Sequence, residues 1–210
     1  MIILAHRGYW KDKSGKNTTK AFKRSFSHGF GVEIDVRDYK GSLVVSHDIA
    51  DSSSLSLDKF FFTYNKYGAN LPLALNIKSD GLQEKLKYLI EKYNIKNYFV
   101  FDMSIPDTIL YLDFGMNVLI RRSEYEHELE ISSNIHGIWL DQFESDWYDI
   151  DLIEGIIKKW KLVCIVSPDL HGRDHKSCWS LLADRSVLSN SKMMICTDYP
   201  VQAEEYFNEK

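Results

Sequence analysis

The sequence has few cysteines, and they follow no pattern that would build or link a structure. Its 210 residues include only three, Cys164, Cys178 and Cys196, and no two are spaced as Cys-x-x-Cys. An odd number without that spacing argues against a disulfide-built miniprotein and against a cysteine zinc site. We therefore expect buried, unpaired thiols in a reducing compartment, which makes this a cytoplasmic protein.

Long apolar runs are also missing. The longest are five or six residues, far short of the ~20 that cross a membrane as a helix. Residues 1–5 are apolar, but they are too few for the core of a secretion signal and are followed at once by His6 and Arg7. We expect neither a membrane span nor an export signal.

Neither sign of charge dominates. Lysine and arginine number 26 against 30 acidic residues, giving a net charge of −4 at pH 7. This balance argues against a nucleic-acid partner held mainly by bulk charge, whereas a small phosphorylated ligand needs only a few local cations. The 44% hydrophobic and 27% charged content is that of an ordinary globular chain. With no linker or repeat, residues 1–210 are expected to form one domain.

Short apolar runs alternate with amphipathic stretches along the whole chain. The runs are rich in Val, Ile and aromatic residues, as strands are, and lie at residues 2–5, 32–36, 73–77, 98–101, 118–120, 137–140, 162–166 and 193–196. Helical stripes separate several of them, including one that Asn17 is expected to cap and Gly29 to end. Residues 41–46 predict an extra strand paired back on the second one. The pattern predicts an α/β protein, a single compact (β/α)8 TIM barrel with a small β-hairpin extension after strand 2. An open doubly wound sheet is the alternative.

Two acidic residues lie inside the second predicted strand. Period 2 places Glu33 and Asp35 on one face and the apolar residues 32, 34 and 36 on the other. If the apolar face packs under helices, both carboxylates point into the barrel, where they repel each other. A hard cation such as Mg²⁺ or Ca²⁺ would relieve that repulsion. The alternative is a strand whose acids form salt bridges facing water.

Further polar residues follow the other strands. Asn76 and Lys78 share a face in the third predicted strand, with a solvated strand end as the alternative. His6 and Arg7 end the first strand, where arginine suits phosphate and histidine can move a proton near neutral pH. His47 ends the extra strand and faces the same pocket if that strand folds over the barrel mouth.

Taken in order, these segments resemble the opening of the glycerophosphodiester phosphodiesterases, which belong with the phosphatidylinositol-phospholipase-C-like (β/α)8 phosphodiesterases. The strong likeness spans residues 5–48 and rests on Ala-His-Arg-Gly at 5–8, Asn-Thr at 17–18, Ala-Phe at 21–22, Glu-Ile-Asp-Val at 33–36, Gly at 41 and Val-Val-Ser-His-Asp at 44–48. Residues 76–78 match the family's Glu-x-Lys in part, and residues 197–200 are similar to its Thr-Asp-x-Pro.

The resemblance implies metal-dependent hydrolysis of a glycerophosphodiester-like substrate to a phosphomonoester and an alcohol, in lipid metabolism. It implies one divalent cation, Mg²⁺ or Ca²⁺, and the following roles: acid/base catalysis by His6 and His47, phosphate binding by Arg7 and Lys78, and metal binding by Glu33, Asp35 and Asn76.

The sequence also departs from the family. Asn76 stands where the family has a third acidic ligand, and Gly15-Lys16 replaces its Pro-Glu, so that a cation stands where the family has an anion. A sugar or cell-surface-polymer phosphodiester is then an alternative substrate, with Trp139 or Trp10 stacking on it. A non-catalytic phosphate- or sugar-phosphate-binding barrel is a second alternative. A metal amidohydrolase ranks lower, because its His-x-His pair is missing from the first strand.

Overall fold

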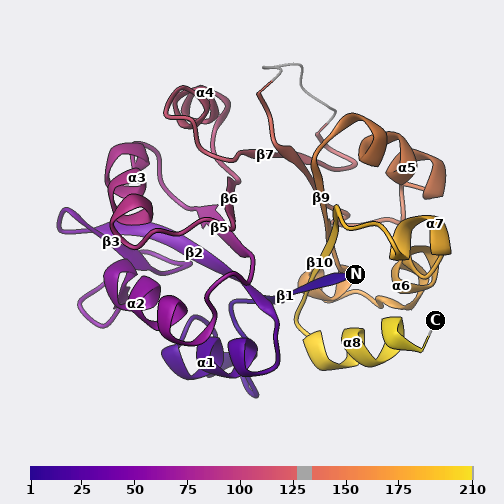
Figure 1. The fold of residues 1–210 in the computed structure, drawn as a ribbon, viewed down its shortest axis with the longest axis horizontal. Helices are drawn as coiled ribbons and strands as arrows, with labels where there is room; N and C mark the ends of the chain where they lie inside the picture. Colours follow the sequence, from indigo (N-terminus) through magenta and orange to yellow (C-terminus); the bar gives the residue numbers. More distant parts are fainter. Residues whose placement is uncertain (127–133, 210) are drawn as a thin grey trace. The chain divides into compact units, whose positions relative to one another are not determined.

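A computed structural model describes residues 1–126 and 134–209. These residues form two compact units, which are described separately: an N-terminal unit of Ala5–Val118, and a C-terminal unit of Met1–Leu4 with Leu119–Lys210. Figure 1 shows the N-terminal unit in indigo to magenta and most of the C-terminal unit in orange to yellow. All eight strands expected from the apolar runs are present.

The N-terminal unit is a mixed sheet with helices. Its elements are β1 (Ile2–His6, whose first three residues count with the other unit), η1 (Lys13–Gly15), α1 (Thr19–Ser27), β2 (Gly31–Tyr39), β3 (Ser42–Val45), β4 (Leu55–Ser56), α2 (Leu57–Tyr67), β5 (Leu73–Ile77), α3 (Gln83–Lys92), β6 (Tyr98–Phe101) and α4 (Ile105–Asp113). Strand β2 is next to β1 and is parallel to β5, which is parallel to β6. Strands β3 and β4 extend the sheet in antiparallel fashion.

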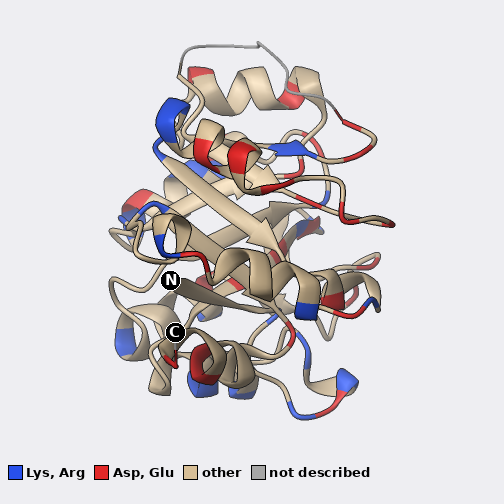
Figure 2. Cartoon of the chain, turned by 90° about the vertical axis from the view of Figure 1, so that its right-hand side faces the viewer, with Lys and Arg blue, Asp and Glu red and all other residues tan. Residues whose placement is uncertain are grey.

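The C-terminal unit repeats the strand–helix alternation. Its elements are β7 (Leu119–Arg122), β8 (Gly137–Leu140), α5 (Ile150–Lys159), β9 (Leu162–Val166), η2 (Pro168–His171), α6 (Lys176–Leu182), α7 (Arg185–Leu188), β10 (Met193–Thr197) and α8 (Pro200–Asn208). The order β7-β8-β9-β10 is parallel throughout. Figure 2 shows both acidic and basic positions along the ribbon.

The alternation of side chains along β2 builds the core of the N-terminal unit. Val32, Ile34 and Val36 are fully buried and join one hydrophobic cluster with residues of α1, α2, β5 and α3. Within this cluster the rings of Phe22 in α1 and Phe60 in α2 meet edge to face, with centroids 4.8 Å apart. Because period 2 sends neighbouring residues to opposite faces, the same packing fixes where the acidic residues of β2 point.

The predicted hairpin is confirmed, with Val36 opposite Val45 in the β2–β3 pair. Its turn has positive φ angles at both Lys40 (48°) and Gly41 (82°), as a tight two-residue hairpin turn requires. This turn brings the chain back along β2, so that the residues after β3 return toward the carboxyl end of β1.

The expected helix cap is wrong by one residue. Thr18, not Asn17, caps α1, and its Oγ1 accepts a hydrogen bond from the backbone N–H of Ala21 at 3.3 Å. Asn17 has a left-handed backbone with φ 56° and donates its amide elsewhere. The expected end of this helix is confirmed, because Gly29 follows it with φ 77°.

Helix α2 was not expected from the sequence. Its aromatic run favours a strand by local propensity, yet Leu57, Phe60, Phe61 and Tyr64 follow helical spacing and are all buried. The side chain of Ser56 accepts a hydrogen bond from the N–H of Lys59 and so caps the helix. In the described part of the chain, no helix has the length and apolar character needed to cross a membrane.

Gly8 provides a test of the turn that follows β1. It has φ 85°, and a Cβ at this position would lie 2.9 Å from the Cβ of Ala21. Gly8→Ala therefore combines left-handed backbone strain with a clash, and we expect it to lower the free energy of unfolding by about 2–4 kcal/mol in urea denaturation.

Gly29→Ala is the matched control. Gly29 has a similar φ of 77°, but a Cβ added there would meet nothing within 4 Å. Gly29→Ala should lower the free energy of unfolding by about 1 kcal/mol, the cost of a left-handed backbone at alanine alone. Equal losses in the two variants would contradict the close approach of the turn to α1.

Candidate functional site

The carboxyl ends of β1, β2 and β5 bring polar side chains together in the N-terminal unit. Glu33 and Asp35 lie on the face of β2 opposite its apolar residues, and they are only 1% and 0% exposed. Asp35 is paired in register with Asn76 of β5, so these two side chains are neighbours on the same face. Two like charges are thus buried on one strand, which is costly unless other groups compensate them.

Three side chains approach Asp35. The Nε atom of Arg7 lies 3.0 Å from its Oδ2, and the amide of Asn17 donates a hydrogen bond to the same oxygen at 2.8 Å. The Nζ atom of Lys78 lies 3.5 Å from Oδ1. Asp35 therefore has two cationic neighbours, Arg7 and Lys78, and one amide donor, Asn17.

Glu33 is less well compensated. Its Oε2 accepts a hydrogen bond from the backbone N–H of Arg7 at 3.2 Å and lies 3.9 Å from Nε2 of His6. Burial and the charge of Asp35 raise the pKa of Glu33 to about 8, while Arg7 and Lys78 oppose that rise. A group with a +2 charge bound here would reverse the balance and favour the ionised carboxylate.

Lys78 connects this cluster to the end of β6. Its Nζ lies 3.7 Å from Oδ2 of Asp102, in addition to its contact with Asp35. When all groups are ionised, the three carboxylates of Glu33, Asp35 and Asp102 exceed the two cations, Arg7 and Lys78, by one formal charge. Once Glu33 is ionised, the cluster therefore attracts a cation even after its own lysine and arginine are counted.

The buried side-chain oxygens at this site that have no hydrogen bond to the described residues include Oδ1 of Asn76 and Oδ1 of Asp35, the register pair of β5 and β2. Carboxylate and amide oxygens are the ligands that Mg²⁺ and Ca²⁺ prefer, and Glu33 supplies a further carboxylate. The residues present fit a hard divalent cation. Residues 1–126 and 134–209 contain no group of three His, Cys, Asp or Glu side chains placed to hold a metal, and the third donor of this set is an amide.

His47 follows β3 and is the more exposed of the two histidines. Its Nδ1 lies 2.8 Å from Oδ1 of Asp48, and its side chain is 45% exposed. The hydrogen bond with His47 holds the pKa of Asp48 below its usual value. A pocket of about 530 Å³ has both His47 and Arg7 in its wall, so that the hairpin places an imidazole in the same pocket as the arginine.

The backbone is strained where it supports these groups. Positive φ angles occur at Arg7 (55°), Asn17 (56°) and Asp102 (73°), which are half of the six non-glycine residues with this conformation in the described chain. Such angles cost of order 1 kcal/mol or more and persist only where the surroundings impose them. At Arg7 the unusual angle accompanies a backbone N–H that donates to Glu33 while the side chain reaches Asp35.

The structure thus brings together six of the residues selected from the sequence by direct contact or register: His6, Arg7, Glu33, Asp35, Asn76 and Lys78. Trp139 lies in β8 of the C-terminal unit and is 4% exposed, and its role in substrate binding stays a prediction. Sequence reasoning missed Asn17 as a partner of Asp35, because it was assigned to a helix cap. It also missed the pairing of Asp102 with Lys78, which the parallel strands β5 and β6 could have indicated.

No family model matches the sequence, and no curated protein matches it. Solved structures do match over the whole chain. A glycerophosphodiester phosphodiesterase from Agrobacterium tumefaciens superposes with a TM-score of 0.70 at 14% identity, covering 100% of both chains. A phosphodiesterase from Oleispira antarctica, determined in complex with its product sn-glycerol-3-phosphate, gives 0.67 at 13% identity and covers 99% of this chain and 97% of its own. A glycerophosphodiester phosphodiesterase from Thermotoga maritima gives 0.64 at 16% identity and covers 98% of both chains.

At these identities the comparisons establish the fold. The chain has the α/β fold of the glycerophosphodiester phosphodiesterases, as a divergent example of it, and the predicted TIM-barrel class with an antiparallel hairpin beside β2 is confirmed. The hydrogen-bonded strand order is compatible with that class, although the ladders between the described strands do not close a ring.

Glu33→Gln tests the cost of burying the second carboxylate. The raised pKa of Glu33 means that its stabilising contribution is present below pH 4.5 and is lost as the pH rises through about 8. We therefore expect the free energy of unfolding of the variant, relative to that of the wild type, to rise by at least about 1 kcal/mol between pH 5 and pH 8. The measurement is urea unfolding in the presence of EDTA.

Glu91→Gln, which replaces an exposed glutamate of α3, is the control and should show the same difference at both pH values. If Glu33→Gln also shows no change in its difference from wild type between pH 5 and pH 8, the carboxylate of Glu33 is not destabilised by its neighbours.

Proposed function

We propose that the protein hydrolyses a phosphodiester to a phosphomonoester and an alcohol, using the cluster at the ends of β1, β2 and β5. The observation that supports this most is the pair of buried carboxylates, Glu33 and Asp35, held beside Arg7, Lys78 and the ring of His6. The fold shared with three phosphodiesterases gives independent support. A glycerophosphodiester-like substrate follows from the sequence resemblance, and a sugar or polymer phosphodiester is the alternative.

Charge neutralisation is the first requirement of this reaction. A phosphodiester carries one negative charge, which increases on the phosphoryl oxygens as the new bond forms. Arg7 and Lys78 supply the fixed positive charge, because each already faces the acidic cluster with a side chain no more than 20% exposed. Partial burial strengthens their interaction with phosphate, since less water screens it.

Proton transfer is the second requirement. One imidazole accepts the proton of the attacking water, and the other donates a proton to the departing alcohol oxygen. His6 is held near Glu33, and His47 is held by Asp48. If a neighbouring hydroxyl of the substrate attacks in place of water, the same two transfers release the alcohol and leave a cyclic phosphate.

Glu33, Asp35 and Asn76 would hold the divalent cation that we propose, Mg²⁺ or Ca²⁺. When bound, such a cation supplies Lewis-acid stabilisation of charge on the phosphoryl oxygens. The ligand set fits because two of its oxygens, on Asp35 and Asn76, lack a hydrogen-bond donor in the described structure. Replacement of an acidic ligand by Asn76 lowers the charge of the site and, we infer, the affinity for the cation.

A non-catalytic phosphate-binding protein is the second candidate, and Asn76 favours it, because loss of a charged ligand is one way for such a site to lose its chemistry. Calorimetry with glycerophosphocholine, together with product analysis, separates the two. Binding without release of a phosphomonoester would support the binding protein.

The single-domain organisation stays a prediction. The cytoplasmic location that we propose is supported by the absence of disulfides among the three cysteines, all of which are described.

The primary test is a panel of phosphodiesters with EDTA and then with Mg²⁺, Mn²⁺ or Ca²⁺ restored. We expect turnover that is lost in EDTA and recovered with at least one cation. Full turnover in EDTA would overturn the metal assignment, and no turnover of any diester under any condition would overturn the proposed function.

His6→Ala and His47→Ala test the acid/base assignment. Each should lower kcat by about 10²–10⁴-fold, because positioned proton transfer contributes that much, with little change in thermal stability. His28→Ala, which removes an exposed histidine of the same unit, should retain wild-type kcat. Retained kcat in either catalytic variant would refute its role.

Asn76→Asp tests the third ligand. A third carboxylate should raise the affinity for Mg²⁺ or Ca²⁺ by about tenfold or more in calorimetry, because ligand charge sets the affinity of such sites. Asn208→Asp, at an exposed position at the end of α8 in the C-terminal unit, adds the same charge outside the ligand set and should leave the affinity unchanged. An unchanged Kd in Asn76→Asp would remove Asn76 from the metal site.

A further inference from the structure

The pocket that contains Arg7 and His47 is also lined by residues that the proposed reaction does not use. It has a volume of about 530 Å³, and the segments around η1 and before β4 contribute to its lining. Lys13 and Lys16 come from the first segment, and Ser53 and Ser54 come from the second. This volume lies within the ~300–1,000 Å³ typical of pockets for small molecules.

The wall of this pocket is positively charged. Its ionised residues are three cations, Arg7, Lys13 and Lys16, against one carboxylate, Asp48. Arg7 faces Asp35 at 3.0 Å, and Asp48 is bonded to His47, so both are already engaged. Lys13 and Lys16 contribute two of the three positive charges of the lining, which would attract an anionic group of a ligand.

Lys16 is held in place rather than extended freely into water. Its Nζ lies 4.5 Å from the centre of the Trp10 ring, a cation–π contact. The indole N–H of Trp10 in turn donates a hydrogen bond to the carbonyl oxygen of His6 at 3.1 Å. Lys16 is thus positioned relative to the end of β1, where a phosphodiester would bind.

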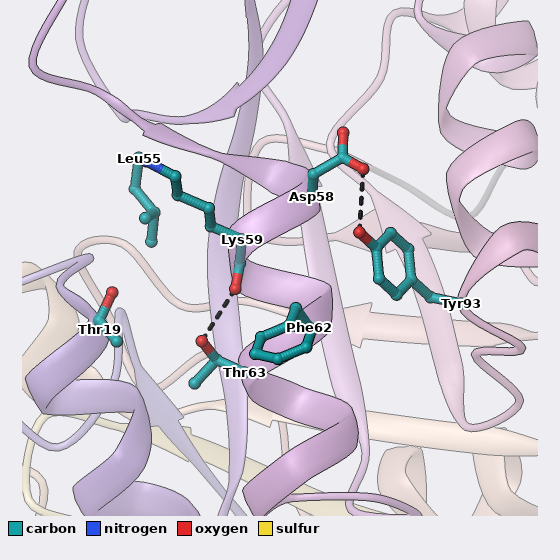
Figure 3. A pocket seen from close by; sticks show the side chains of 7 residues that line it. All are labelled: Thr19, Leu55, Asp58, Lys59, Phe62, Thr63 and Tyr93. Atoms are coloured by element: carbon teal, nitrogen blue, oxygen red, sulfur yellow. Dashed lines mark hydrogen bonds between the residues drawn. The ribbon is translucent and has the colours of Figure 1, made fainter.

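A second, neighbouring pocket has a different character. It has a volume of about 420 Å³ and shares Thr19 and Leu55 with the first, and Phe62 and Tyr93 give it an aromatic surface (Figure 3). Its acid, Asp58, accepts hydrogen bonds from the hydroxyl of Tyr93 at 3.0 Å and from Nζ of Lys92 at 2.6 Å. This pocket offers no comparable excess of positive charge, so an anion would bind on the side of Lys13 and Lys16.

We propose that Lys13 and Lys16 form a second anion-binding subsite, and that the substrate carries a further phosphate in addition to the scissile diester. The proposal rests on the proposed phosphodiesterase function. It makes the substrate class a polyol phosphate with at least two phosphate groups, one in the scissile diester beside Arg7 and one beside the two lysines. Ser53 and Ser54 also line this pocket, and the hydroxyl oxygen of Ser53, which donates to Asp51, can accept a hydrogen bond from a polyol hydroxyl.

Two matched substrates test this. Glycerophosphoglycerol has one charged diester and neutral ends, and its terminally phosphorylated derivative carries one further phosphate on one of the two glycerols. The wild type should prefer the derivative by about tenfold in kcat/KM, mainly through KM, since binding charge remote from the reacting atoms acts on KM. The preference should fall as salt is raised, because surface charges are screened.

The double variant Lys13→Met, Lys16→Met should reduce the preference, taken as the ratio of the two kcat/KM values, to about one. The double variant to arginine, which keeps both charges, should restore most of it. Lys11→Met is the control, because Lys11 is an exposed lysine of the same segment outside this pocket. A preference that survives the double methionine variant would overturn the proposed subsite.

Equilibrium binding separates failure of the subsite from failure of the proposed function. Calorimetry should show tighter binding of glycerol 1,3-bisphosphate than of glycerol 3-phosphate, with the difference lost in the double methionine variant. If neither diester is hydrolysed but this lysine-dependent difference is present, the subsite stands and the phosphodiesterase function fails. If both diesters are hydrolysed equally and the lysines have no effect on either measurement, the function stands and the subsite fails.

Discussion

The carboxylates of Glu33 and Asp35 lie buried on one face of β2, and the remaining features of the site follow from the need to compensate them. Asp35 obtains Arg7, Asn17 and Lys78 as partners, whereas Glu33 has a backbone N–H and the edge of a histidine ring. The imbalance appears in the raised pKa of Glu33. Such an arrangement destabilises the protein when nothing is bound. Proteins keep buried charges of this kind mainly at functional sites, where the charge takes part in binding or catalysis.

The same strand that buries the charges also stabilises the unit around them. Val32, Ile34 and Val36 belong to the hydrophobic cluster, so β2 cannot shift by one residue without exposing its apolar side and burying its polar side in the core. Register with β5 then brings Asn76 beside Asp35. Positive φ angles at Arg7, Asn17 and Asp102 are tolerated because these fixed neighbours engage their side chains.

The part of this site that could be predicted from the sequence is the part in which polar and apolar residues alternate along a strand. Glu33 and Asp35 could be assigned to one face because valine and isoleucine alternate with them, and all eight strands could be placed from similar runs. Asn17 could not be assigned correctly, since an asparagine before a helix favours the cap, and only the tertiary position of Asp35 shows its actual partner. Helix α2 was missed because its aromatic run satisfies strand propensity as well as helical spacing. The role proposed for Lys16 depends on its contact with Trp10, which no sequence pattern encodes.

Crystals of the protein grown with Mn²⁺ would test the central claim most directly, because anomalous scattering locates this ion independently of the protein density. If the acidic pair of β2 exists to bind a cation, an anomalous peak should lie within ligand distance, about 2.0–2.6 Å, of oxygens from Glu33, Asp35 and Asn76. Full-occupancy manganese elsewhere with none at these oxygens, in crystals that bind a phosphodiester at Arg7, would contradict the account.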